Sequence, residues 1–254
     1  MQREDSSITI DLWFVPEAEA SEDARLLARY SELCTAEERT RCGQFLLPRM
    51  QRQYLVTRAL VRTVLSHYEQ QPPEAWRFTS DYYGKPSVAA PQPPTVRFNL
   101  SHTDGLIICG VLRDAAGNCE IGVDIEHRNR RTAGMDLARR YFAAAEIAAL
   151  EQLTEAEQAV GFFEYWTLKE AYVKARGMGL SLPLDQFAFE LRPPGPPQIV
   201  FAQPGETAED WSFAQFQFGP RHQGAVAVCG ARGAKINLNL REALPLTDLC
   251  PTRG

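Results

Sequence analysis

Two stretches of the sequence repeat each other, and this repetition constrains the fold more than any other feature. Residues 105–110 read GLIICG and residues 224–230 read GAVAVCG. A helical segment lies farther upstream of each stretch, over residues 54–65 and 163–175. Recurrence of this order predicts an α+β fold of two similar α/β lobes that arose by duplication. Chance recurrence of apolar strands that end in Cys-Gly is the alternative.

The repetition also predicts the domain boundaries. We expect one lobe over residues 1–117, a second over 118–240, and a tail of little pattern over 241–254. A chain of 254 residues, with 44% hydrophobic and 23% charged residues, is long and apolar enough to bury a core in each lobe.

Periodicity and turn residues predict the individual elements. Apolar–polar alternation and short apolar runs predict strands at 8–15, 76–80, 96–100, 106–112, 121–125, 187–191, 199–202, 211–218 and 225–229. Helices are expected over 21–33, 54–65, 135–153 and 157–176, where Gly177 ends the last run. A further helix is expected to begin at the capping residue Thr35.

Charge and cysteine usage exclude several classes of protein. The net charge of −5 argues against non-specific nucleic-acid binding, which needs a basic surface. No apolar run approaches the roughly 20 residues that span a bilayer, and the polar residues 1–7 are not a signal peptide. The six cysteines form no CxxC pair, so we expect reduced thiols in a cytoplasmic protein that does not bind membranes.

Residues 121–126, IGVDIE, place two carboxylates on one face of an expected strand. Side chains alternate along a strand, so Asp124 and Glu126 point the same way, roughly 7 Å apart. Oxygen ligands at such a spacing suit a hard divalent cation such as Mg²⁺. A half-exposed strand with a solvated acidic face is the alternative.

The helical segment 163–175, FEYWTLKEAYVKA, carries a second charged set. Glu170 and Lys174 lie four residues apart and share a helix face, with Trp166 one turn earlier on the same stripe. The alternative is a routine surface ion pair beside a packed tryptophan.

Together, the GVDIE strand and the motif W-x-x-K-E-A-x-x-K some 40 residues later resemble the signature of 4′-phosphopantetheinyl transferases. The longer, two-lobed type, which activates peptide and polyketide synthetases (surfactin-synthetase-activating-like), matches best. Further matching pieces follow the family's order at 37–42 (EERTRC), 83–86 (YGKP), 98–102 (FNLSH) and 177–180 (GMGL).

This resemblance implies an activity and a metal site. A serine of an acyl or peptidyl carrier protein would attack the phosphate of coenzyme A that bears pantetheine, releasing adenosine 3′,5′-bisphosphate. Asp124, Glu126 and Glu170 would hold one Mg²⁺ on the pyrophosphate, and Mn²⁺ also takes such oxygen ligands. The resemblance also makes Asp124, Glu170 and Lys174 the catalytic set. Lys174 would contact the phosphate or the pantetheine arm, and the proton acceptor is Glu170 or a metal-bound water.

The resemblance further implies local cations and hydrogen-bond donors for coenzyme A. The residues at these positions are Arg41, Arg52, Lys85, Asn99, Ser101 and His102, with Lys174. Basic residues of the segment 127–131, namely Arg128, Arg130 and Arg131, are a hypothesis for steering acidic carriers; a charged loop is the alternative. A monomer is expected. The sequence does not separate fatty-acid, polyketide and nonribosomal-peptide carriers.

Two rival functions are compatible with parts of the pattern. Another Mg²⁺-dependent enzyme acting on a pyrophosphate would keep the acidic residues, but has no need of Lys174 or of the N-x-S-H sequence at 99–102. A catalytically inactive carrier-binding protein on the same fold should have lost metal ligands, whereas Asp124, Glu126 and Glu170 are all present.

Overall fold

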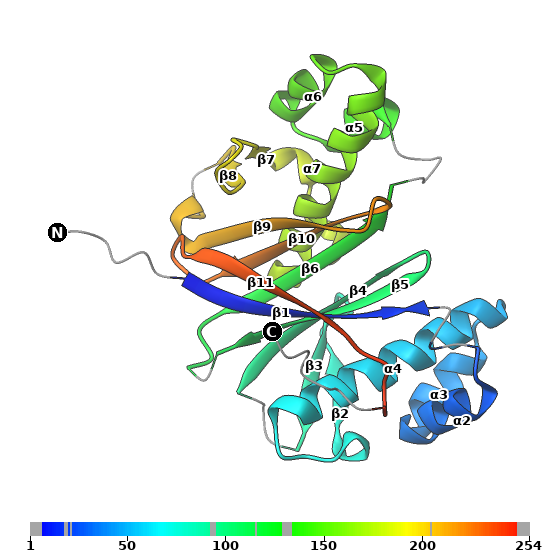
Figure 1. Cartoon of the computed structure of the whole chain (residues 1–254). Helices are drawn as coiled ribbons and strands as arrows, with labels where there is room; N and C mark the ends of the chain where they lie inside the picture. The colour runs from blue at the N-terminus through cyan, green and yellow to red at the C-terminus, as the bar shows by residue number, and fades with distance from the viewer. Residues whose placement is uncertain are drawn as a thin grey trace. The chain divides into compact units, whose positions relative to one another are not determined.

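The computed structural model describes residues 7–17, 20, 22–91, 95–114, 116–128, 134–203 and 205–247. The chain forms two compact units (Figure 1). The metal-motif unit, as we call it, contains residues 118–237 with the first residues of the chain; the second unit contains residues 10–117 and 238–254. Each unit combines helices with antiparallel strands, which confirms the expected α+β class.

In the metal-motif unit, a three-stranded antiparallel sheet has the order β6-β10-β9, and β7 pairs with β8. Its strands are β6 (Glu120–His127), β7 (Phe187–Glu190), β8 (Gln198–Phe201), β9 (Trp211–Phe218) and β10 (His222–Cys229). Its helices are α5 (Met135–Tyr141), α6 (Ala144–Glu151) and α7 (Glu155–Arg176). Helix α7 lies against β6 and β10 and so brings the two charged motifs of the sequence onto neighbouring elements.

Gly122 explains how closely α7 approaches β6. A Cβ atom at this position would lie 1.9 Å from the carbonyl oxygen of Ala171 and 2.4 Å from the backbone nitrogen of Ala175. Only glycine leaves room for the helix backbone to pass at this distance. The glycine of the GVDIE motif therefore sets the spacing between strand and helix.

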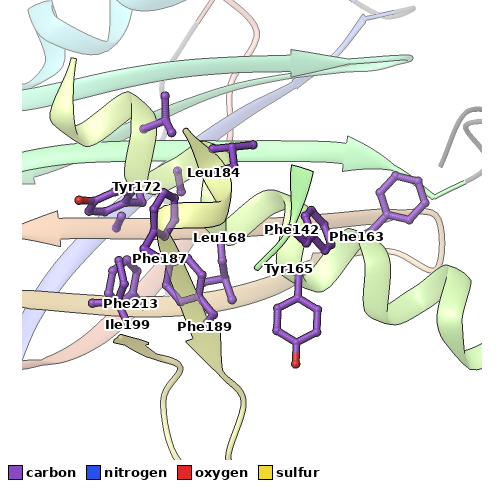
Figure 2. Close-up of a cluster of buried hydrophobic side chains, with 14 of the residues drawn as sticks. Phe142, Phe163, Tyr165, Leu168, Tyr172, Leu184, Phe187, Phe189, Ile199 and Phe213 are labelled. Carbon is purple, nitrogen blue, oxygen red and sulfur yellow. The ribbon is translucent and has the colours of Figure 1, made fainter. Parts of the chain in front are cut away.

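An aromatic core fixes the other side of α7 (Figure 2). Tyr172 packs on Phe187 with ring centroids 4.6 Å apart, and on Trp211 at 4.7 Å. Phe142 stacks on Phe162 at 5.2 Å. Buried rings of this kind contribute burial of apolar area and preferred edge or stacked geometry, so the helix has one defined orientation on its sheet.

The second unit contains a four-stranded sheet of order β11-β1-β5-β4 and a separate β2-β3 ribbon. Its strands are β1 (Ser7–Pro16), β2 (Arg77–Ser80), β3 (Pro86–Ala90), β4 (Val96–Thr103), β5 (Leu106–Arg113) and β11 (Lys235–Glu242). Its helices are α2 (Ala24–Leu33), α3 (Ala36–Gly43) and α4 (Pro48–Tyr68). Apolar residues of α4, among them Val56, Leu60 and Val64, form its core with Trp13 and Ile107 of the sheet.

The expected tail over 241–254 is wrong for its first residues. Strand β11 belongs to the sheet of the second unit, and the backbone nitrogen of Ala243 donates to the carbonyl oxygen of Phe14 at 2.9 Å. Ala243 is buried in the core. The partner strand β1 lies more than 200 residues earlier in the sequence, so no local signal predicts the pairing. Residues 248–254 lie outside the described part of the chain.

The single helix expected over 135–153 is divided in two. Phe142 and Ala143 have extended backbone conformations, and the backbone nitrogen of Ala143 donates to the carboxylate of Glu146 at 3.0 Å. Phe142 turns inward to stack on Phe162, which favours the break over a continuous helix. No glycine or proline marks this position, so the sequence pattern did not reveal it.

Strand β4 runs three residues farther than expected. Ser101, His102 and Thr103 pair with Ile108, Ile107 and Leu106, so Asp104 and Gly105 alone form the turn. Gly105 has a φ of +79°, which glycine adopts without strain and which makes so tight a turn possible. Ser101 and His102 therefore lie on a strand and not in a loop.

Candidate active site

Asp124 and Glu126 lie on β6 at positions opposite Ala225 and Gln223 of β10. Their side chains alternate with Val123 and Ile125, as expected for a strand. Both carboxylates are nevertheless buried, with 5% and 9% of their residue surface exposed. The strand is therefore covered on both faces, and the alternative of a solvated acidic face is excluded.

Helix α7 brings Lys174 onto the acidic strand. The Lys174 ammonium donates to the Asp124 carboxylate at 2.7 Å and to the carbonyl oxygen of Val123 at 3.2 Å. Its side chain keeps 28% of its surface exposed, against 6% for Asp124. Lys174 is thus bonded to a carboxylate of a neighbouring strand, which is removed from water and held by a charge-assisted hydrogen bond.

Glu170 lies one turn before Lys174 on the same helix. Burial, assisted by the Asp124 and Glu126 carboxylates and opposed by Lys174, raises the pKa of Glu170 to about 7. The effect of both strand carboxylates on this helix residue places the three acids in one electrostatic field. Packing of α7 on β6 thus places Lys174 on Asp124, with Glu170 one turn earlier on the same helix.

The donor set of these three acids suits a hard divalent cation. Carboxylate oxygens are the ligands that Mg²⁺ prefers, and a cation would relieve the mutual repulsion that contributes to the raised pKa of Glu170. Within the described residues, no group of three or more His, Cys, Asp or Glu side chains is arranged to hold a metal ion as it stands. A cation at this position is thus supported by the carboxylate chemistry of these residues, and not by a preformed ligand cluster among the described side chains.

A buried ion pair next to Glu170 was missed from the sequence. Lys169 has a fully buried side chain whose ammonium lies 2.8 Å from the Glu146 carboxylate. It also donates to the carbonyl oxygens of Leu184 and Phe187, at 2.6 and 2.8 Å. Glu146 in turn accepts from the backbone nitrogen of Phe189 at 2.9 Å. The pair ties α7 to α6 and β7.

The residues expected to bind coenzyme A lie in the second unit. Arg41 is exposed in the last turn of α3, and Arg52 is half-buried in the first turns of α4. Lys85 follows the turn before β3, where the Asp81 carboxylate accepts from the backbone nitrogens of Tyr83 and Lys85 at 3.0 and 2.9 Å. This turn holds the backbone at Lys85 in a fixed conformation.

Strand β4 divides the other three residues between its two faces. Asn99 and Ser101 are buried, with 4% and 5% exposed, and they share one face because they are two residues apart. His102 is exposed and lies on the opposite face, in line with Phe98 and Leu100. The strand therefore does not present the three side chains as one group.

Arg128 follows β6 and is half-buried. Its guanidinium donates to the side-chain oxygen of Gln223 at 2.6 Å, which ties the residue to β10. Arg130 and Arg131, the other residues of the carrier-steering hypothesis, lie outside the described residues.

The five cysteines of the described part of the chain are free thiols. Among the described helices, none combines the length and the apolar character that crossing a membrane requires.

Comparison with known proteins identifies two family models that match in tandem. Residues 21–111 match the model for the N-terminal domain of 4′-phosphopantetheinyl transferases, and residues 120–229 match the model of the 4′-phosphopantetheinyl transferase superfamily. The two matches fall on opposite sides of the boundary between the units, so each unit has its own match.

Curated relatives agree with these matches. The chain is 33% identical to the 4′-phosphopantetheinyl transferase Sfp of Bacillus subtilis over 167 residues, which is 66% of this chain and 70% of the relative. It is 29% identical to the 4′-phosphopantetheinyl transferase HetI of a Nostoc species over 222 residues, which is 87% of this chain and 88% of the relative.

Proposed function

The chain belongs to the 4′-phosphopantetheinyl transferase superfamily, in its two-domain Sfp-like type, and from this premise we propose that it transfers 4′-phosphopantetheine from coenzyme A to a serine of acyl or peptidyl carrier proteins. The reaction breaks the phosphoanhydride bond next to the pantetheine phosphate. It forms a phosphodiester to the serine oxygen and releases adenosine 3′,5′-bisphosphate, while the serine proton passes to a base.

One observation carries this proposal: α7 packs on β6 so that Lys174 bonds to Asp124, with Glu126 on the same strand and Glu170 one turn earlier on the same helix. Phosphoryl transfer depends mainly on positioning and on neutralising charge at the phosphates. We assign the three acids as ligands of Mg²⁺, with Mn²⁺ as a substitute. When bound, the ion would supply charge neutralisation at the pyrophosphate.

Lys174 has two functions in this proposal. Its ammonium donates to the Asp124 carboxylate at 2.7 Å and so holds this buried side chain in place. With more than a quarter of its side chain exposed, it also presents a positive charge to a phosphate or to the pantetheine arm.

Glu170 is our candidate for the proton acceptor. Its carboxyl group lies one turn before Lys174 on α7, and glutamate carboxylates serve as general bases in many enzymes. The same residue is an assigned metal ligand, so a water molecule at the site is the second candidate. The two candidates differ in whether Glu170 itself must take the proton.

The local cations of the second unit supply the remaining charge for coenzyme A in this proposal. Arg41, Arg52, Lys85 and His102 would meet phosphate groups, and Asn99 and Ser101 would contribute hydrogen bonds. A protein with a net charge of −5 needs such local groups to bind a polyanion. The monomeric state and the cytoplasmic location stay predictions.

Release of adenosine 3′,5′-bisphosphate tests the proposal. The protein is incubated with coenzyme A, Mg²⁺ and an apo carrier protein, and the nucleotide is quantified by chromatography. We expect release only when carrier and metal are both present, and none with EDTA or with Asp124→Ala. Release that needs no carrier would favour the pyrophosphate-cleaving rival. No release with fatty-acid, polyketide or peptide-type carriers would favour an inactive carrier-binding protein.

A further inference from the structure

Helix α3, which carries Arg41, is short and is tied to α4 by only a few side chains, Cys42 and Glu38 among them. It contains eight residues, and Cys42 is its buried member. A helix this short is marginal in water and depends on tertiary contacts and caps. Whatever fixes α3 therefore also fixes the position of Arg41.

Glu38 provides that anchor. Its carboxylate accepts from the backbone nitrogen of Thr35 at 2.9 Å, and its own backbone nitrogen donates to the Thr35 hydroxyl at 3.2 Å. This reciprocal capping box starts the helix. The same carboxylate accepts from the Arg62 guanidinium of α4 at 2.7 Å, and Arg58 lies 3.8 Å away. One side chain thus both begins α3 and ties it to α4.

Arg62 is an unusual partner, because its side chain is fully buried. It donates to the carbonyl oxygen of Arg58 at 3.2 Å and lies over the ring of Phe78, 5.0 Å from the centroid. Phe78 packs edge-on against Phe98 of β4 at 5.9 Å. The guanidinium is held by fixed groups of α4 and β2, so it can define a position for the carboxylate.

The Glu38 anchor carries more positive than negative charge. One carboxylate faces two guanidiniums, and the Nε of Arg62 is buried with no hydrogen-bond partner in the described part of the chain. Removing the Glu38 charge would leave a buried cation uncompensated, which weakens the contact between α3 and α4. Arg41 lies three residues after Glu38, on the adjoining turn of the same short helix.

We propose that Glu38 and Arg62 are positioning residues that hold Arg41 in place for coenzyme A. The proposal rests on the proposed function, because Arg41 has a role only if the protein binds this substrate. Glu38 and Arg62 act through α3 and make no contact with the substrate themselves. The predicted consequence is a selective loss of affinity for coenzyme A.

The test compares Glu38→Gln with Glu37→Gln in steady-state loading of a carrier protein. Glutamine at position 38 still accepts from the Thr35 nitrogen, so the cap is kept while the charge is lost. Glu37 is exposed on the same helix and provides the matched control. We expect Glu38→Gln to raise the KM for coenzyme A about tenfold, the size of one lost charge-assisted hydrogen bond. The KM for the carrier, and both constants of Glu37→Gln, should stay as in the wild type.

A double-mutant cycle with Arg41→Ala separates positioning from general destabilisation. If Glu38 acts through Arg41, adding Glu38→Gln to Arg41→Ala leaves the KM for coenzyme A unchanged. Additive effects, or an Arg41→Ala protein with wild-type KM, would overturn the inference while leaving the proposed function intact. A wild-type protein that loads no carrier would instead overturn the proposed function.

Arg62→Lys keeps the charge and provides a second variant if Glu38→Gln unfolds. Lysine cannot reproduce the planar guanidinium over Phe78 together with both hydrogen bonds. We expect an intermediate rise in the KM for coenzyme A, confirmed by calorimetric titration of coenzyme A alone. Wild-type affinity in this variant would contradict the proposed role of Arg62.

Discussion

Glu170 has two proposed functions in the metal-motif unit, as a metal ligand and as the candidate proton acceptor. It is half-buried on α7, and its position one turn before Lys174 follows directly from helix periodicity. We expect Glu170→Gln to lower kcat for carrier loading at least about a hundredfold, as for loss of a general base or metal ligand.

Glu155→Gln is the matched control, since Glu155 is exposed in the first turn of the same helix. Both variants should keep the wild-type circular dichroism spectrum. A Glu170→Gln protein with wild-type kcat would remove this residue from the mechanism.

Lys169 and Glu146 allow a test of stability that is separate from catalysis. Lys169→Met leaves the Glu146 carboxylate buried without its ammonium partner, which costs about 3–5 kcal/mol of unfolding free energy. Urea unfolding measures this loss. The double variant Lys169→Met/Glu146→Gln should recover part of it, because no uncompensated charge stays buried. A single variant as stable as the wild type would show that the pair contributes nothing.

The sequence predicted the members of the acidic set, but not their surroundings. Alternation placed Asp124 and Glu126 on one side of a strand, and the four-residue spacing placed Glu170 beside Lys174. The burial of both strand carboxylates depends on how α7 packs on the sheet, which no local pattern states. Nothing in the sequence distinguishes Lys169 from an ordinary helix lysine, because its partner Glu146 belongs to a different helix.

At the level of elements, the contact between β6 and α7 depends on the absence of a side chain at Gly122. Gly122→Ala would place a methyl group 1.9 Å from the Ala171 carbonyl oxygen, so strand and helix must separate. We expect a loss of about 3 kcal/mol or more in unfolding free energy, at the upper end for overpacked cores, together with reduced carrier loading.

Gly43→Ala is the control for this prediction, because nothing lies within 4 Å of a Cβ atom at that position. Its stability should equal or slightly exceed that of the wild type. If Gly122→Ala were as stable as Gly43→Ala, the close approach of α7 to β6 would be wrong.

Asp11 joins three elements of the second unit and makes their stability depend on pH. Burial alone would raise its pKa, but hydrogen bonds from Tyr68, Asn239 and Arg241 outweigh burial and lower the pKa below 3.8. A lowered pKa in the folded state means that Asp11 stabilises the fold above about pH 4. This contribution is lost as the pH falls through the lowered pKa.

Thermal unfolding of the wild type and Asp11→Asn between pH 7 and pH 2.5 checks this prediction. The variant should have the lower Tm at pH 7, and the difference should shrink as the pH falls below 4. A difference that is constant over this range would show that ionisation of Asp11 does not matter.

Local signals in the sequence predicted where several helices begin and end. The elements that were predicted wrongly depend on contacts outside the local sequence window. The Thr35 cap and Gly177, with a φ of +65°, delimit helices as expected. The break at Phe142 depends on a ring stack with Phe162, and β11 depends on pairing with β1 at the other end of the chain. Neither partner lies within the sequence window in which periodicity can be judged.

Over the full length of the chain, the two similar stretches of sequence fall in two different units, each of which combines helices with an antiparallel sheet. In the proposed mechanism, the metal-motif unit supplies the acidic set and Lys174, and the second unit supplies cations for coenzyme A. The family models match these units separately, which supports treating each as a module with its own residues.

Intact mass spectrometry of an apo carrier protein tests the proposed reaction and its metal site in one experiment. The carrier is incubated with coenzyme A, Mg²⁺ and the wild-type protein or its Asp124→Asn variant. We predict a mass gain of one phosphopantetheine group with the wild type, abolished by EDTA, restored by excess Mg²⁺, and absent with the variant. A mass gain that persists in EDTA or with Asp124→Asn would contradict the assigned metal site, and an unchanged carrier with the wild type would contradict the proposed reaction.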